Sequence, residues 1–81
     1  MKIIQIIKTL SGKKDIPKAF KQYFTDPTEK VDYIHILGLS DDGDIYERKF
    51  ALFIDVPSQD EIKNGKSVVK QYKWTKWEKI D

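Results

Sequence analysis

The length and composition of the chain restrict it to a small folded protein. Its 81 residues have room for one domain, so we expect residues 1–81 to form a single small globular domain. A hydrophobic content of 40% excludes a disordered chain, and a pI near 8.8 lies below the range of strongly basic nucleic-acid-binding domains. The lack of cysteine excludes a disulfide framework and a thiol nucleophile, and it favours the reducing cytoplasm as the compartment.

The N-terminal segment KIIQIIKTL, residues 2–10, predicts a first strand. Both of its alternating sets of side chains are apolar, which is typical of a strand in the centre of a sheet. These sets are Ile4, Ile6 and Leu10, and Ile3 and Ile7. The segment SGKKD at 11–15 breaks the pattern. Because the apolar run is too short to span a membrane and lacks a cleavage site, we expect no membrane contact.

Residues 15–24, DIPKAFKQYF, predict a short helix. Asp15 is a suitable N-cap, and Pro17 fits the first turn, where a missing N–H costs nothing. Four apolar residues recur at helical spacing and form one stripe: Ile16, Phe20, Tyr23 and Phe24. Such a short helix needs packing against a sheet to be stable.

A hairpin is expected in the middle of the chain. VDYIHILGL, residues 31–39, and IYERKFALFIDV, residues 45–56, have strand patterns. Between them, Asp42-Gly43 is a strong turn signal, because glycine takes the positive φ that such turns require. Pro57 ends the second strand.

The final segment VVKQYKWTKWEKI, residues 68–80, favours a last strand because it is rich in valine and aromatic residues. Residues 57–67 form a loop or a short turn of helix, with a turn at Asn64-Gly65. The order is therefore strand, helix, strand, strand, strand. We predict an α+β fold, a mostly antiparallel four-stranded sheet with one short helix.

Two motifs that suggest ligand binding are better interpreted as turns. NGKS, residues 64–67, resembles the end of a phosphate-binding loop, but Asp60 stands where that motif needs glycine. DDGDIYE, residues 41–47, is acidic, but its spacing does not match a calcium loop. We therefore expect no metal and no cofactor.

The chain offers no recognisable catalytic set. His35 is the only histidine, and its own strand provides no carboxylate on the same face, since Asp32 points to the other side. No serine lies in a nucleophile-elbow motif. We expect a structural or interface role for His35 and no enzymatic activity.

The last strand is the candidate binding surface, because aromatic residues interleaved with cations can stack bases and hold phosphates. Its residues are Lys70, Tyr72, Lys73, Trp74, Lys76, Trp77 and Lys79. Strict alternation divides the lysines, with Lys70 and Lys76 on one face and Lys73 and Lys79 on the other. Trp77 would point away from Trp74 unless a bulge near residues 75–76 brings it back. We expect one tryptophan to close the core and the other to be exposed.

ILGLSDDGDIYERKF, residues 36–50, together with KWEKI, residues 76–80, resembles the strand–turn–strand unit of a propeller blade closed by a tryptophan. A similar pattern occurs in short uncharacterised phage and prophage proteins that begin with a strand like MKIIQI. The resemblance implies a compact β-rich accessory protein, and it implies no catalytic residues.

These observations lead to two functional hypotheses. The first is a non-catalytic protein-binding module encoded by a phage or mobile element, with an unknown protein partner and self-association through an edge strand as a further option. The alternative is a small single-stranded nucleic-acid-binding protein that uses the strand from Tyr72 to Lys79.

Overall fold

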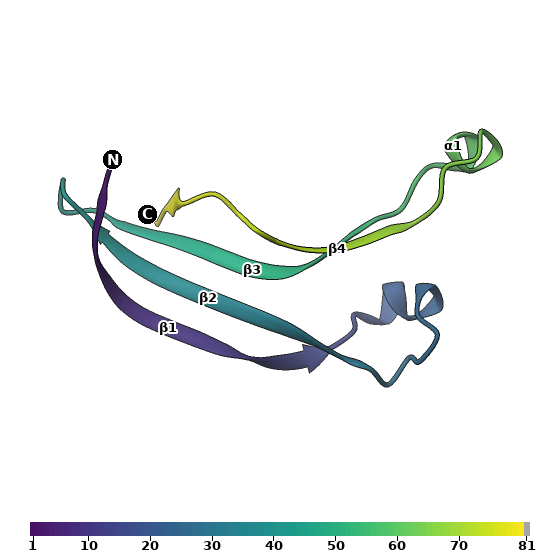
Figure 1. The fold of residues 1–81 in the computed structure, drawn as a ribbon, viewed down its shortest axis with the longest axis horizontal. Helices are drawn as coiled ribbons and strands as arrows, with labels where there is room; N and C mark the ends of the chain where they lie inside the picture. Colours follow the sequence, from purple (N-terminus) through teal and green to yellow (C-terminus); the bar gives the residue numbers. More distant parts are fainter. Residues whose placement is uncertain (81) are drawn as a thin grey trace.

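The structure is a computed structural model that describes residues 1–80, and it consists of one curved antiparallel sheet with two short helices in its connections (Figure 1). The elements in chain order are β1 (Ile3–Asp15), η1 (Lys18–Tyr23), β2 (Lys30–Ser40), β3 (Ile45–Asp55), α1 (Gln59–Lys63), β4 (Val69–Trp74) and β5 (Glu78–Lys79). Strands β1 to β4 lie side by side in chain order, and β5 also pairs with β3. The predicted mostly antiparallel sheet with one short helix is confirmed in outline, but the sheet has five strands instead of four, and the one α-helix lies between β3 and β4 instead of after the first strand.

Strand β1 differs from the sequence prediction in length and in position. It continues through SGKKD to Asp15, because each residue from Lys8 to Asp15 pairs in regular register with β2. Ion pairs across this part, Lys13 with Asp32 and Asp15 with Lys30, compensate for its polar composition. β1 also lies at the edge of the sheet, although its two apolar faces predicted a central strand.

The predicted first helix is the six-residue 3-10 helix η1 instead of an α-helix, and Asp15 does not cap it. β2 and β3 pair only as far as Tyr33 and Ala51 and then separate, and η1 lies at the end of the β1–β2 arm (Figure 1). The only buried apolar side chains among residues 1–80, Ile16 and Val31, lie beside η1. No helix in this part of the chain is long and apolar enough to cross a membrane.

The β2–β3 hairpin forms at the predicted turn. Gly43 has a φ of 87°, and Ser40 N–H donates to the Asp44 carbonyl at 2.9 Å. Gly65 likewise has a φ of 89° and follows α1. Both turns predicted from sequence are therefore confirmed.

The hairpin register divides the sheet into two faces, because paired residues of neighbouring strands share a face. We call one of them the aromatic face; it carries Ile34, Ile36, Gly38, Arg48, Phe50, Leu52, Tyr72 and Trp74. The opposite face carries a mixture of apolar and charged side chains, including Tyr33, His35, Leu37, Glu47, Lys49, Ala51 and Lys73. The helix η1 packs against Leu52 and Ile54 at one end of the aromatic face, and no described element forms a full second layer over either face.

A bulge interrupts the last strand and returns Trp77 to the aromatic face. Trp74 pairs with Phe50 and Glu78 with Glu47, so the outer strand has one residue more than β3 between these pairs. Thr75 anchors the bulge, because its N–H donates to the Lys49 carbonyl at 2.7 Å. The half-buried Trp77 then packs against Gly38, where a Cβ atom would lie 3.2 Å from its ring.

Replacing Gly38 with alanine tests this packing. A Cβ at Gly38 would lie 2.8 Å from Cγ2 of Ile3 as well as against Trp77. We expect Gly38→Ala to lower the free energy of unfolding by about 1–3 kcal/mol, measured by chemical denaturation. In the double variant Gly38→Ala/Ile3→Ala the clash is relieved. The losses of unfolding free energy in the two single variants should therefore sum to more than the loss measured in the double variant. Strict additivity would contradict the proposed contact.

Candidate interaction surface

Three aromatic side chains, Phe50, Tyr72 and Trp74, form a cluster on the aromatic face, which we call the aromatic cluster. The rings of Phe50 and Tyr72 stack with centroids 5.5 Å apart and an angle of 11° between their planes. The ring of Trp74 is tilted against Phe50 at 5.2 Å. Phe50 is half-buried between its neighbours, whereas Tyr72 and Trp74 are 41% and 38% exposed. The cluster is therefore a supported surface with two accessible rings.

Local contacts hold these rings in place. The Tyr72 hydroxyl accepts a hydrogen bond from the Asp32 N–H at 3.2 Å. Asp32 lies on β2 just beyond Tyr33, the last residue of β2 that pairs with β3, so the Tyr72 side chain spans β3. The Arg48 guanidinium lies 5.0 Å from the centroid of Trp74 and donates from Nε to the Thr75 carbonyl at 2.9 Å. These contacts hold the Tyr72 and Trp74 rings in fixed orientations.

The lysines of the last strand do not gather around the aromatic cluster. Lys70 donates to the Tyr23 carbonyl at 3.0 Å and lies 4.6 Å from the ring of Phe24, so it ties β4 to η1. Lys73 lies on the opposite face, 4.7 Å from the ring of Phe53.

Lys79 forms an ion pair with Asp44 at 3.4 Å, close to the hairpin turn. The bulge places Lys79 on the same face as Lys70, because Lys79 pairs with Tyr46. The predicted grouping of Lys79 with Lys73 is therefore wrong. Lys76, at the bulge, is exposed.

The two tryptophans differ as the sequence analysis expected. Trp77 is half-buried against Gly38, whereas Trp74 is exposed and lies on the outer strand of the sheet. Both lie on the aromatic face, which the bulge allows. Of the two, only Trp74 offers a large accessible ring for a partner.

His35 has a carboxylate partner that the sequence analysis missed. Its Nε2 lies 2.7 Å from Oε2 of Glu47, on the face opposite to the aromatic cluster. Glu47 comes from β3, so a search along the histidine's own strand could not find it. The signal was present in the turn, since a hairpin that turns at 42–43 places residue 47 diagonal to residue 35. The pair lies among Lys49 and apolar neighbours and stabilises the hairpin.

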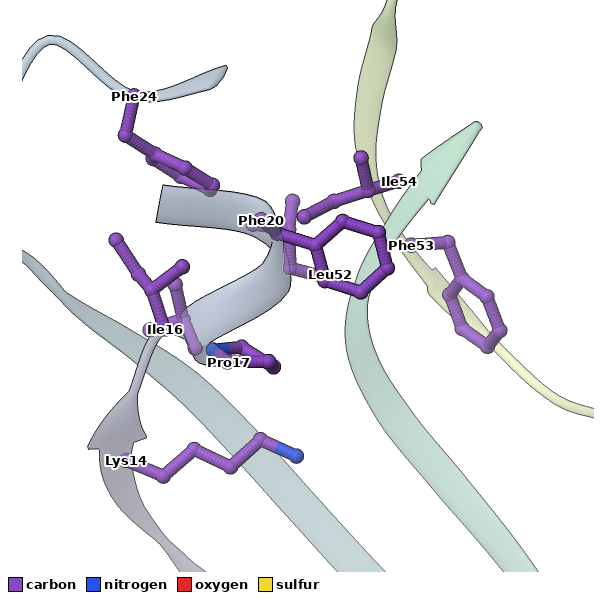
Figure 2. Close-up of a pocket in the computed structure, with 9 residues that line it drawn as sticks. Lys14, Ile16, Pro17, Phe20, Phe24, Leu52, Phe53 and Ile54 are labelled. Carbon is purple, nitrogen blue, oxygen red and sulfur yellow. The ribbon is translucent and has the colours of Figure 1, made fainter. Parts of the chain in front are cut away.

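A hollow lies between η1 and β3, beside the buried side chains of Ile16 and Val31. Figure 2 shows the Phe20 ring reaching from η1 towards Leu52 and Ile54 of β3. Its volume is about 160 Å³, whereas small-molecule pockets usually measure roughly 300–1,000 Å³. The lining is mainly apolar, so we interpret the hollow as imperfect packing beside Ile16 and Val31.

The acidic hairpin tip is occupied by contacts within the turn. The Ser40 hydroxyl donates to Oδ1 of Asp42, and this hydrogen bond lowers the pKa of Asp42 below its ordinary value. Ser40 is itself buried, and its Oγ also accepts from the Asp44 N–H at 3.3 Å. Within residues 1–80, no three histidine, aspartate or glutamate side chains are grouped to hold a metal ion.

Comparison of the chain with protein families, with curated proteins and with solved structures found no match. Only the geometry of the chain itself therefore bears on its function. That geometry offers two accessible apolar surfaces, the aromatic cluster and the outer edge of β1, where Ile4, Ile6, Ile7 and Leu10 are each about half exposed.

The Ser40–Asp42 bond predicts a pH-dependent contribution to stability. Because the folded-state pKa of Asp42 is lowered, the bond stabilises the fold above the unfolded pKa, and this contribution is lost as the pH falls through the folded pKa. We expect Ser40→Ala to destabilise the protein at pH 7 and to raise the pKa of Asp42 in an NMR titration.

The difference in unfolding free energy between Ser40→Ala and the unmodified chain should shrink at acidic pH. Ser67→Ala, which changes an exposed serine outside the strands, is the control and should have no such effect. An unchanged pKa of Asp42 in Ser40→Ala would contradict the assignment of this hydrogen bond.

Proposed function

We propose that this chain is a small non-catalytic module that binds a partner protein through the aromatic face, with Trp74 as the central contact. The observation that supports this most is the single-layer sheet. Its aromatic face carries apolar and aromatic side chains at most positions of β2, β3 and β4. The helix η1 packs only against the end of this face at Leu52 and Ile54, and Tyr72 and Trp74 remain exposed. A sheet normally buries one face against a second layer, so such a face favours an external partner.

The dimensions of the molecule support the same proposal. The radius of gyration is 16.5 Å, whereas a compact chain of this length has about 12 Å. The accessible surface is 6262 Å², whereas a compact monomer of 9.5 kDa exposes about 5,000 Å². The excess of about 1,200 Å² exceeds the roughly 800 Å² that each partner buries in a standard protein interface.

Trp74 is the residue we expect to dominate binding. Tryptophan, tyrosine and arginine are the residues most enriched at energetic hot spots of interfaces. Here the Arg48 guanidinium lies over the Trp74 ring, and the Phe50 ring packs beside it and stacks with Tyr72.

The alternative is a single-stranded nucleic-acid-binding protein that stacks bases on Tyr72 and Trp74. The exposure of both rings on one face favours it. Against it, Lys70, Lys73 and Lys79 are each engaged within the chain or lie on the other face. The single arginine is also engaged, with Trp74 and Thr75. Few cationic side chains are therefore free to contact the phosphates of a bound nucleic-acid strand.

We place the module in the cytoplasm, and the resemblance to short phage proteins is the basis for proposing a phage or mobile element as its source. We propose no catalytic activity for it. Its one histidine is half-buried against Glu47 on the face away from the aromatic cluster.

Replacement of Trp74 tests the proposal directly. We expect Trp74→Ala to lose a partner protein that the unmodified chain retains in an affinity pull-down, with at least tenfold less recovered, because it removes the central ring. The matched control is Val69→Ala on the same strand, whose exposed side chain lies on the opposite face. It should retain the partner. Circular dichroism would establish that both variants are folded.

The alternative is tested with a labelled oligothymidine. Binding at low salt that weakens steeply towards physiological salt, and that Trp74→Ala abolishes, would favour nucleic acid over protein. Retention of the partner protein by Trp74→Ala would overturn the proposed binding surface.

A further inference from the structure

The outer edge of β1 is the second apolar surface, and it is independent of the aromatic cluster. β1 is the longest strand, with 13 residues, yet it pairs only with β2. Its other edge therefore presents a row of backbone groups without a strand beside it, about 43 Å long. Four of its apolar side chains are roughly half exposed: Ile4 at 58%, Ile6 at 51%, Ile7 at 49% and Leu10 at 47%.

The sequence of this strand suits a different position from the one it occupies. Apolar residues on both faces are typical of a strand with neighbours on both sides. From Ile3 to Ile7 the strand carries no charge, and a natural edge strand is normally protected by charges or proline in such a stretch. The apolar pattern of β1 would fit its position if a further strand paired with its outer edge.

Two bulges add to the exposed apolar surface. The register with β2 shifts between Ile3 and Gln5 and again between Ile6 and Lys8, so Ile4 and Ile7 are the extra residues. Neither has a residue opposite it on β2 to cover its side chain. Since bulges also limit regular backbone pairing, side-chain packing must provide much of any contact here.

We propose that the first half of β1 joins two copies of this chain, which lie antiparallel across a two-fold axis close to Ile6. An antiparallel pair of identical strands is self-complementary, as a two-fold interface requires. This arrangement places the uncharged stretch of one copy against that of the other. It also places Lys8 beside Ile4 of the second copy, so that the lysines do not face each other.

The opposite edge of the sheet explains why the assembly would end at two copies. β4 has only six residues, two of them lysine, and the bulge with Lys76 follows directly. These are the features by which natural sheets avoid edge-to-edge pairing. The same chain thus has one protected edge and one apolar edge. The excess accessible surface of about 1,200 Å² exceeds the roughly 800 Å² that each copy would bury in one such contact.

The test is the mass of the protein in solution, measured by sedimentation equilibrium on the full chain and its variants. The unmodified chain should have twice its mass of 9.5 kDa, and Ile7→Lys should be monomeric. Ile62→Lys is the matched control, because Ile62 lies on α1 and is exposed to nearly the same extent, 51%. It should remain dimeric.

Several results would overturn the proposal. These are a monomeric unmodified chain at about 100 μM, a dimeric Ile7→Lys, and assemblies larger than two. Trp74→Ala must also remain dimeric, since its dissociation would place the interface on the aromatic face. This variant separates the dimer from the proposed partner contact, because each can fail without the other.

Folding of the variant is controlled independently. If Ile7→Lys does not fold, Ile4→Lys replaces it, because Ile4 is the other bulge residue and is more exposed. Amide hydrogen exchange on the unmodified chain provides a measurement without mutation. Exchange of the β1 amides should slow as the protein concentration rises, and exchange that is independent of concentration would contradict pairing through β1.

Discussion

The register of the β2–β3 hairpin determines the rest of the structure. It is set by the turn at Asp42-Gly43, where Gly43 adopts a positive φ and Ser40 is buried beneath the loop. Since side chains alternate along a strand, a shift of one residue would exchange the two faces. The observed register places Phe50 beside Ile34, and it brings Glu47 within reach of His35 on the other side. The turn therefore separates an aromatic face from a partly charged one.

A single layer is the second constraint on this molecule. Eighty-one residues with this many aromatic and branched side chains can build a sheet, but η1 and α1 are too short to cover it. Apolar residues consequently remain accessible on a face and at an edge. In a small domain, stability depends on how much apolar surface is buried, so contacts with partners would contribute to the stability of the fold as well as to function.

Much of this architecture could be predicted from local chemistry. The glycine turns, the alternating strands and the compensating bulge near Thr75 are each encoded within a few residues. Local chemistry could not assign β1 to the edge, because a strand pattern shows which faces are apolar but not which neighbours are present. The extension of β1 through Ser11–Asp15 was missed for a related reason. Those polar residues are held by ion pairs with Asp32 and Lys30, which belong to another strand.

The candidate site could be predicted only in part, because local sequence does not show contacts with distant residues. The segment itself identified Tyr72, Trp74 and Trp77 as candidate surface aromatics but did not show which tryptophan is exposed, and the positions of the lysines depended on distant partners. Lys70 is directed by the Tyr23 carbonyl, and Lys79 by Asp44. Neither contact has a signal in the alternation of the last strand. The segment is aromatic and basic in sequence, but its surface is mainly aromatic because several of its lysines contact other parts of the chain.

The two proposed surfaces are geometrically related. A two-fold axis that pairs two β1 edges in antiparallel fashion runs perpendicular to the sheet, so the aromatic faces of both copies lie on the same side. Within each copy the aromatic cluster lies towards the β4 edge, the edge farthest from β1. The dimer would then present two copies of Trp74 at opposite ends of one continuous sheet. A partner with two matching sites would bind both at once, and the second contact would benefit from a high effective concentration without any additional residue.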